Sequence, residues 1–206
     1  SVLAAGYAPT RHETNFTAET DATRITAVRL ELLTDPRLPR GGPGRSIYGL
    51  CALTEFKLVA APADDPGRTT NLKIARAFAE VNPPQADLDA VFDDRSGKQR
   101  VTGPIEYAID GKDETAWSID IGPGRSNVPR QAVFVLDEPF VAPAGAVLTF
   151  KLSQRHGGWN SDDNQNLNLG RFRLSAAGEV QPSTADLIPL DVARLLEQES
   201  GSWSED

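Results

Sequence analysis

The stretch AIDGKDETAW, residues 108–117, gathers acidic and hydroxyl side chains around one glycine and ends on a tryptophan. Its carboxylates could act in catalysis, hold a metal ion, or accept hydrogen bonds in a tight turn. Two carboxylates can serve as acid and base when they lie roughly 5 to 9.5 Å apart across a cleft. Asp110, Asp113 and Glu114 instead share one short expected loop. We therefore disfavour catalysis and keep the metal loop and the structural turn as alternatives.

The metal interpretation rests on oxygen chemistry, because calcium binds carboxylates, hydroxyls and backbone carbonyls that a sharply turning loop brings together. Asp110, Thr115 and the carbonyls between them could supply several such ligands. An EF-hand is excluded, since its third ligand position would fall on Lys112 and its twelfth on Ile121. In the structural alternative, Asp110 and Thr115 only hydrogen-bond the turn while Trp117 enters the core.

A second candidate region is SQRHGGWNSDDNQNLNLG, residues 153–170, which joins two expected strands. Sugars present an apolar ring face and a rim of hydroxyls, so their sites combine an aromatic platform with polar side chains. This composition predicts a carbohydrate site on loops at the sandwich edge, although a long polar hairpin would also explain it. The expected platform is Trp159, with Arg155, His156 and Asn160 as polar contacts and Tyr48 as a second aromatic.

Other catalytic patterns are missing from the sequence. Neither His12 nor His156 accompanies a GxSxG or HExxH motif. The segment GGPGRS, residues 41–46, leads into an expected strand and lacks the Lys-Ser/Thr pair of a phosphate-binding loop. The single cysteine, Cys51, excludes an internal disulfide and lies in an apolar run, so we predict a buried thiol. We therefore expect a protein that is not an enzyme.

These candidate residues need a framework, and short alternating segments separated by Gly, Pro, Asp and Asn predict strands. In RITAVRLELL, residues 24–33, the valine and leucines would face the core while Arg29 and Glu31 face solvent. Several antiparallel segments of this kind predict a β-sandwich. The expected strands are 24–33, 51–59, 131–140, 146–154 and 169–176, with Phe134, Phe150 and Phe172 pointing inward.

We expect one β-sandwich domain in residues 1–177, and a linker, short helix and disordered tail in residues 178–206. The segment KIARAFAEV, residues 73–81, fits either a helical turn or an irregular strand. Loops rich in Gly and Pro are typical of rigid turns or binding surfaces. Such loops are expected at 34–46, 60–71 and 122–130.

Bulk composition limits the partners. Lysine and arginine number 21 against 29 acidic residues, a formal charge of −8, which argues against nucleic acid as a partner. No apolar run approaches the roughly 18 residues of a membrane span. The chain contains no methionine, not even at position 1, and we interpret it as a piece of a longer precursor.

Taken together, the motifs LTEF, AIDG followed by TAW, and LGRFRLS, in that order, resemble the β-sandwich domain of planctomycete-type multidomain proteins that carry c-type cytochrome domains. The resemblance covers roughly residues 1 to 195. That domain is in turn similar to the galactose-binding-like jelly-roll sandwich of discoidin domains and carbohydrate-binding modules. The resemblance implies an extracellular or periplasmic location and a parent chain with other domains.

The resemblance also implies a structural calcium ion at the Ala-x-Asp-Gly and Thr-x-Trp segment. The matching ligands here would be Asp110, Thr115 and the carbonyl of Lys112 or Asp113, completed by the Glu55 carboxylate. Glu55 precedes the Asp-Gly loop here, whereas the family's glutamate lies on the closing strand, so this assignment requires a permuted order. The chain also departs from the family at SIYGLCA, residues 46–52, and in the long loop that contains Trp159.

These observations lead to two expected functions of different classes. The first is a non-catalytic carbohydrate-binding module that binds a polysaccharide or other glycan, with calcium fixing loop geometry. The second is an accessory domain that contacts other domains of the parent chain and positions neighbouring cytochrome or enzymatic domains.

Overall fold

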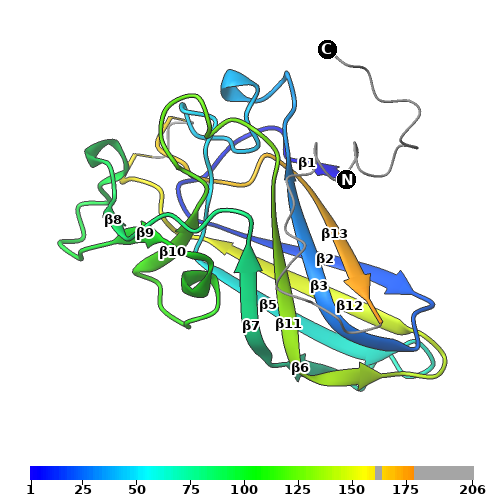
Figure 1. The fold of residues 1–206 in the computed structure, drawn as a ribbon. Coiled ribbons are helices and arrows are strands. Elements are labelled where there is room, and N and C mark those ends of the chain that lie inside the picture. Colours follow the sequence, from blue (N-terminus) through cyan, green and yellow to red (C-terminus); the bar gives the residue numbers. More distant parts are fainter. Residues whose placement is uncertain (161–163, 179–206) are drawn as a thin grey trace, which may run out of the picture.

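The computed structural model describes residues 1–160 and 164–178. Two antiparallel sheets pack face to face, and a small third sheet lies at one end (Figure 1). The first sheet has the order β1 (Val2–Leu3), β13 (Arg171–Ala177), β3 (Arg24–Leu33), β11 (Arg130–Val141) and β7 (Ile74–Ala79). The second has the order β2 (His12–Thr20), β12 (Ala146–Gln154), β5 (Glu55–Pro62) and β6 (Thr70–Leu72).

Alternation along the central strands builds the core between the two sheets. Val28 on β3 pairs with Phe134 on β11, and Phe150 on β12 pairs with Leu58 on β5, so both sheets turn apolar side chains inward. Across the interface Phe56 stacks on Phe134 with ring centroids 3.9 Å apart and planes 3° from parallel. The predicted antiparallel β-sandwich is therefore confirmed.

The predicted strands all form, with small differences in their ends. Residues 51–59 are divided into β4 (Ala52–Leu53) and β5, and the ambiguous segment 73–81 forms the strand β7. Phe134, Phe150 and Phe172 are buried as predicted, and so is the Cys51 thiol, whose pKa burial raises to about 12. The linker and helix predicted after residue 178 lie outside the described residues.

One charged side chain departs from the alternation rule. Glu31 on β3 faces away from the core, yet it is fully buried. The Arg173 guanidinium on the neighbouring strand β13 donates two hydrogen bonds of 2.6 Å to its carboxylate. Cross-strand pairing therefore satisfies this carboxylate and removes it from water, which the alternating pattern alone does not predict.

The third sheet has the order β4, β10 (Thr115–Ser118), β9 (Val101–Gly103) and β8 (Ala86–Asp87). Three short 3-10 helices accompany these segments: η1 (Pro39–Gly41), η2 (Ala90–Phe92) and η3 (Ile105–Ala108). Trp117 on β10 is buried in the main core, and its indole N–H donates to the Val81 carbonyl at 3.1 Å. Trp117 thus anchors the small sheet to the sandwich. Within the described part of the chain, no helix has the length and apolar character needed to cross a membrane.

Candidate functional site

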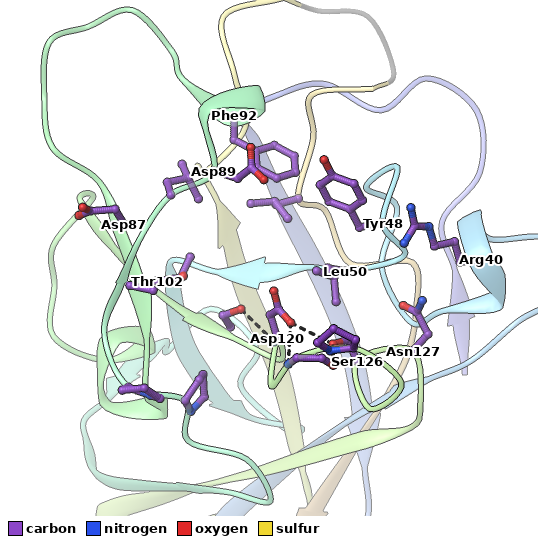
Figure 2. A pocket seen from close by; sticks show the side chains of 18 of the residues that line it. Arg40, Tyr48, Leu50, Asp87, Asp89, Phe92, Thr102, Asp120, Ser126 and Asn127 are labelled. Carbon is purple, nitrogen blue, oxygen red and sulfur yellow. Dashed lines mark hydrogen bonds between the residues drawn. The ribbon is translucent and has the colours of Figure 1, made fainter.

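A pocket of about 770 Å³ lies against the small sheet (Figure 2). Ser118 on β10 and Thr102 on β9 contribute to its wall, because alternation along these strands turns them away from the main core. The rest of the lining comes from segments that are distant in sequence, at 40–50, 83–92 and 120–128, and from Leu167. The volume lies within the roughly 300 to 1,000 Å³ of small-molecule sites.

The apolar part of the pocket is centred on Tyr48. Its ring is half-buried and makes an edge contact with Phe92, at a centroid distance of 6.2 Å. Leu50 and Leu167 extend this surface, and Ala116 and Phe92 form a small core beneath it. The Arg40 guanidinium carbon lies 5.1 Å from the Tyr48 ring centroid.

Polar groups occupy the other walls. Asp89 caps η2 by accepting from the Val91 backbone N–H at 3.0 Å. Asp120 follows β10, accepts from the Gly122 N–H at 3.0 Å and from the Ser126 hydroxyl at 2.9 Å, and so holds the turn that closes the pocket. Figure 2 shows Asp89 beside Phe92 and Asp120 on the opposite side of the hollow. Asp87 stands at the rim, where it accepts from the Gln99 amide.

Close backbone packing supports the Tyr48 side of the pocket. Gly49 has a φ of 75°, in the left-handed region that favours glycine. A Cβ at this position would also lie 2.6 Å from both the Asn127 Oδ1 and the Pro39 carbonyl oxygen. The loop that carries Tyr48 is therefore held against η1 and the 120–128 loop.

The 108–117 stretch forms a hydrogen-bonded turn outside this pocket. The Asp110 carboxylate accepts from the Lys112 backbone N–H at 2.9 Å and from the Thr115 hydroxyl at 2.8 Å. The Thr115 Oγ1 also lies 3.5 Å from the Lys112 carbonyl oxygen. These oxygens are therefore close enough to share one cation, and the same contacts also suffice for a turn without a metal.

Glu55 lies close to this turn, as the expected calcium site requires. Its carboxyl pKa is raised, first by burial and further by the charges of Asp110 and Asp113, while Lys57 and the Gly111 amide act in the opposite direction. Asp113 itself forms an ion pair of 3.0 Å with Arg155. Among the described residues no group of three Asp, Glu, His or Cys side chains is spaced to hold a metal. A calcium ion would therefore depend on Asp110 and Glu55 with hydroxyl and carbonyl oxygens.

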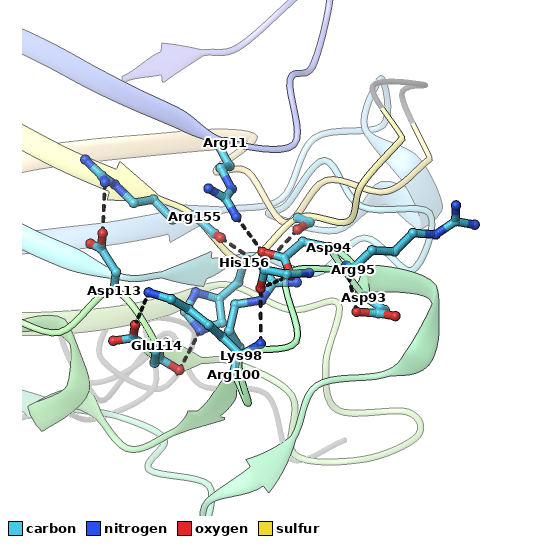
Figure 3. A network of polar contacts seen from close by, with 12 residues as sticks. Arg11, Asp93, Asp94, Arg95, Lys98, Arg100, Asp113, Glu114, Arg155 and His156 are labelled. Carbon is cyan, nitrogen blue, oxygen red and sulfur yellow. Dashed lines mark hydrogen bonds and ion pairs between the residues drawn. The ribbon is translucent and has the colours of Figure 1, made fainter.

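His156 is fully buried beneath its loop (Figure 3). Its Nε2 lies 3.2 Å from the Val101 carbonyl oxygen and 3.3 Å from the Glu114 carbonyl oxygen, so Nε2 carries the proton. Its Nδ1 accepts from the Thr54 hydroxyl at 3.1 Å. Burial and the Arg100 charge lower the His156 pKa to about 4. This side chain has a structural role and offers no surface to a glycan.

Arg100 joins two loops near His156. Its guanidinium donates to the carbonyls of Arg155 and Gly157, at 3.0 and 2.9 Å, and to the Phe92 carbonyl at 2.5 Å. It also forms an ion pair of 3.5 Å with Asp94, to which Arg11 is paired as well. Burial alone would raise the Asp94 pKa, but hydrogen bonds from Ser96 and the Arg100 charge lower it to about 2.

The remaining predicted glycan contacts separate from one another. Trp159 is 51% exposed, its backbone N–H donates to the Asp93 carbonyl at 3.0 Å, and the Arg95 guanidinium carbon lies 3.6 Å from its ring centroid. Asn160 is held by the Gln165 amide oxygen at 2.8 Å. Arg155 instead points toward Asp113, on the side of the 108–117 turn. Tyr48 lines the pocket, and Trp159 does not.

The structure therefore brings together Asp110, Thr115, Lys112 and Glu55, and it divides the five predicted carbohydrate contacts among different surfaces. Sequence reasoning missed Asp89, Asp120 and Phe92 as pocket residues. The available signal was the glycine- and proline-rich composition of the 34–46 and 122–130 loops, since both contribute to the lining. No protein-family model, curated protein or solved structure matches the chain.

Proposed function

We propose that this domain is a non-catalytic carbohydrate-binding module whose glycan site is the pocket lined by Tyr48. The observation that carries the proposal is a hollow of about 770 Å³ that combines an aromatic ring with hydroxyl and carboxylate groups from separate loops. A sugar ring would pack against Tyr48, and its hydroxyls would hydrogen-bond Ser118, Thr102 and Asp120. Trp159 would be an additional platform outside the pocket.

We also propose that the sandwich is a jelly roll of the galactose-binding-like kind. Eight of the described strands are arranged as β1-β13-β3-β11 and β2-β12-β5-β6. When these eight strands are numbered in chain order, the first sheet has the order 1-8-3-6 and the second has the order 2-7-4-5. Two interlocking Greek keys produce this arrangement. Strand β7 then extends the first sheet. From the resemblance of the sequence motifs, we further propose that the domain belongs to a larger exported multidomain protein and lies outside the cytoplasm.

Affinity electrophoresis in gels containing soluble polysaccharides tests the proposed function. Tyr48→Ala should reduce retention by about 10-fold or more, because removing a ring from a sugar contact costs roughly 1.5 to 3 kcal/mol. Tyr48→Leu keeps the apolar packing against Phe92 and should lose retention as well. Tyr7→Ala, a matched change at a tyrosine that is 61% exposed, should retain the glycan normally. Absence of retention of the unmodified domain on every polysaccharide would sink the proposal.

A structural calcium ion at Asp110, Thr115, Lys112 and Glu55 is a separate part of the proposal. The ion would replace the Thr115 to Asp110 hydrogen bond with coordination and would neutralise the buried Glu55 carboxylate, whose pKa is raised. Because a ligand that binds only the native state stabilises it, added calcium should raise the melting temperature and a chelator should lower it. Asp110→Ala should remove this response. An equal melting temperature with chelator and with calcium would contradict the site.

Trp159 favours a second function, an accessory domain that contacts other domains of its parent chain. The indole is half exposed on a loop that Arg100 and backbone hydrogen bonds hold in place. Rigid exposed tryptophans are frequent anchors of protein interfaces. In this case Trp159→Ala would abolish association with the neighbouring domains, and Tyr48→Ala would leave it intact.

A further inference from the structure

The side chains that line the Tyr48 pocket carry a net negative charge. Its charged lining residues are Asp87, Asp89 and Asp120 against Arg40, which leaves a formal charge of −2. The whole chain carries −8, so nothing in the overall charge offsets this local excess. Carboxylates on the walls of a concave site concentrate their field there and raise the local concentration of cations.

The three aspartates are held by neutral partners. Asp87 accepts from the Gln99 amide, Asp89 from a backbone N–H, and Asp120 from a backbone N–H and a serine hydroxyl. Within the described residues, none of the three forms an ion pair, whereas Asp35, Asp94 and Asp113 each pair with an arginine. Their negative charge is therefore available to a ligand.

The one cation of the lining does not neutralise them. The Arg40 guanidinium lies over the Tyr48 ring, at the aromatic side of the pocket. Asp89 and Asp120 stand on opposite sides of the hollow (Figure 2). A ligand whose ring packs on Tyr48 would therefore direct its other edge toward carboxylates.

We propose that the pocket selects a sugar with a free amino group, such as a glucosamine unit, over neutral and acidic sugars. The inference rests on the proposed glycan-binding function and names its ligand class. An ammonium group offers three hydrogen-bond donors and one positive charge, so it can donate to a carboxylate on one wall and be attracted by the field of the others. A uronate would be repelled by the same carboxylates, and a neutral sugar would bind by its ring and hydroxyls alone.

A series of β-1,4-linked tetrasaccharides tests the inference, because its members differ mainly in charge. Binding to the unmodified domain would be measured by calorimetry and NMR shift mapping at about pH 5.5 for the glucosamine, N-acetylglucosamine and glucose tetramers, with the β-1,4-linked glucuronate tetramer as the anionic comparison. The glucosamine tetramer should bind about 10-fold more tightly than the neutral tetramers at about 20 mM salt. This advantage should shrink at about 500 mM salt, where charges are screened within roughly 4 Å.

Two double variants are compared. The first pair of substitutions is Asp89→Asn with Asp120→Asn, in the pocket, and the second, control pair is Asp64→Asn with Asp65→Asn. The amide oxygens of the first pair can still accept from Val91, Gly122 and Ser126, so the turns persist while two charges are lost. The second pair removes the same charge in the turn between β5 and β6. The first pair should remove the advantage of the glucosamine tetramer, and the second should preserve it.

The possible outcomes separate the inference from the function on which it rests. Binding of neutral tetramers in the pocket, with no gain for glucosamine, would overturn the inference and leave the carbohydrate-binding function standing. An advantage that survives in Asp89→Asn with Asp120→Asn would place the charge recognition elsewhere and overturn it as well. If no tetramer shifts any pocket resonance, both the inference and the proposed function fail. If n-butylamine binds as tightly as the glucosamine tetramer, the pocket recognises the positive charge alone, which also contradicts the sugar assignment.

Discussion

At the scale of single residues, the surroundings decide what a polar side chain does. His156 and Trp159 lie three positions apart, yet the imidazole is fully buried with both ring nitrogens occupied while the indole is half exposed. Glu55 alternates with the inward-facing residues of β5, but the 108–117 turn lies against it and only 8% of the residue remains exposed. Residue type alone therefore did not indicate which of these groups could meet a ligand.

The buried imidazole of His156 predicts a pH-dependent stability. Its pKa is about 4 in the native state and 6.5 in the ordinary unfolded chain, so the unfolded state binds the proton more strongly. The unfolding free energy should therefore fall as the pH drops from about 6.5 toward about 4, by about 3 kcal/mol over the full window. Urea unfolding at several pH values measures this change.

Other groups also titrate in that window, so the contribution of His156 is read from a comparison. His156→Gln should show a smaller decrease than the unmodified domain, and His12→Gln, at an exposed position of β2, should behave like the unmodified domain. If the imidazole resonances of His156 titrate near pH 6.5 in the folded domain, the assigned burial is wrong.

At the scale of elements, the geometry of the candidate site depends on the hydrogen bonds and ion pairs that hold loops against strands. Alternation predicted the main strands from local sequence, since a period of two places every second side chain on one face. Loop positions have no such local rule. The 92–94 and 155–159 segments are held together by Arg100, which stands immediately before β9, near the first segment in sequence and more than 50 positions from the second.

Arg100→Gln should therefore loosen two loops together. The substitution would leave carbonyls and the Asp94 carboxylate without their buried cation, and breaking such a pair costs about 3 kcal/mol. We expect a lower unfolding free energy and faster amide hydrogen exchange at residues 92–94 and 155–159. Arg11→Gln, at an arginine whose side chain is 61% exposed, should cost less than about 1 kcal/mol. Equal effects of the two variants would contradict the fastening role of Arg100.

At the scale of the whole molecule, an aromatic contact joins the two large sheets. Phe56 and Phe134 belong to different sheets and are stacked at 3.9 Å. Replacing either with leucine should destabilise the domain, and the double variant should reveal a coupling of about 1 kcal/mol. The effects of Phe56→Leu and Phe172→Leu on the unfolding free energy should be additive, since these two rings do not stack on each other. If the losses of unfolding free energy caused by Phe56→Leu and Phe134→Leu are additive in urea unfolding, the stacking is contradicted.

The sequence by itself determined the β class, the main strands, the inward phenylalanines and the buried Cys51, because alternation and turn residues act over a few positions. It also brought Asp110, Thr115 and Glu55 into one hypothesis, and the structure places them together. Only the tertiary structure decided that Tyr48 faces a pocket shared with Asp89 and Asp120, and that His156 does not. The physical reason is that a pocket forms from segments far apart in the chain, whose packing no local pattern encodes.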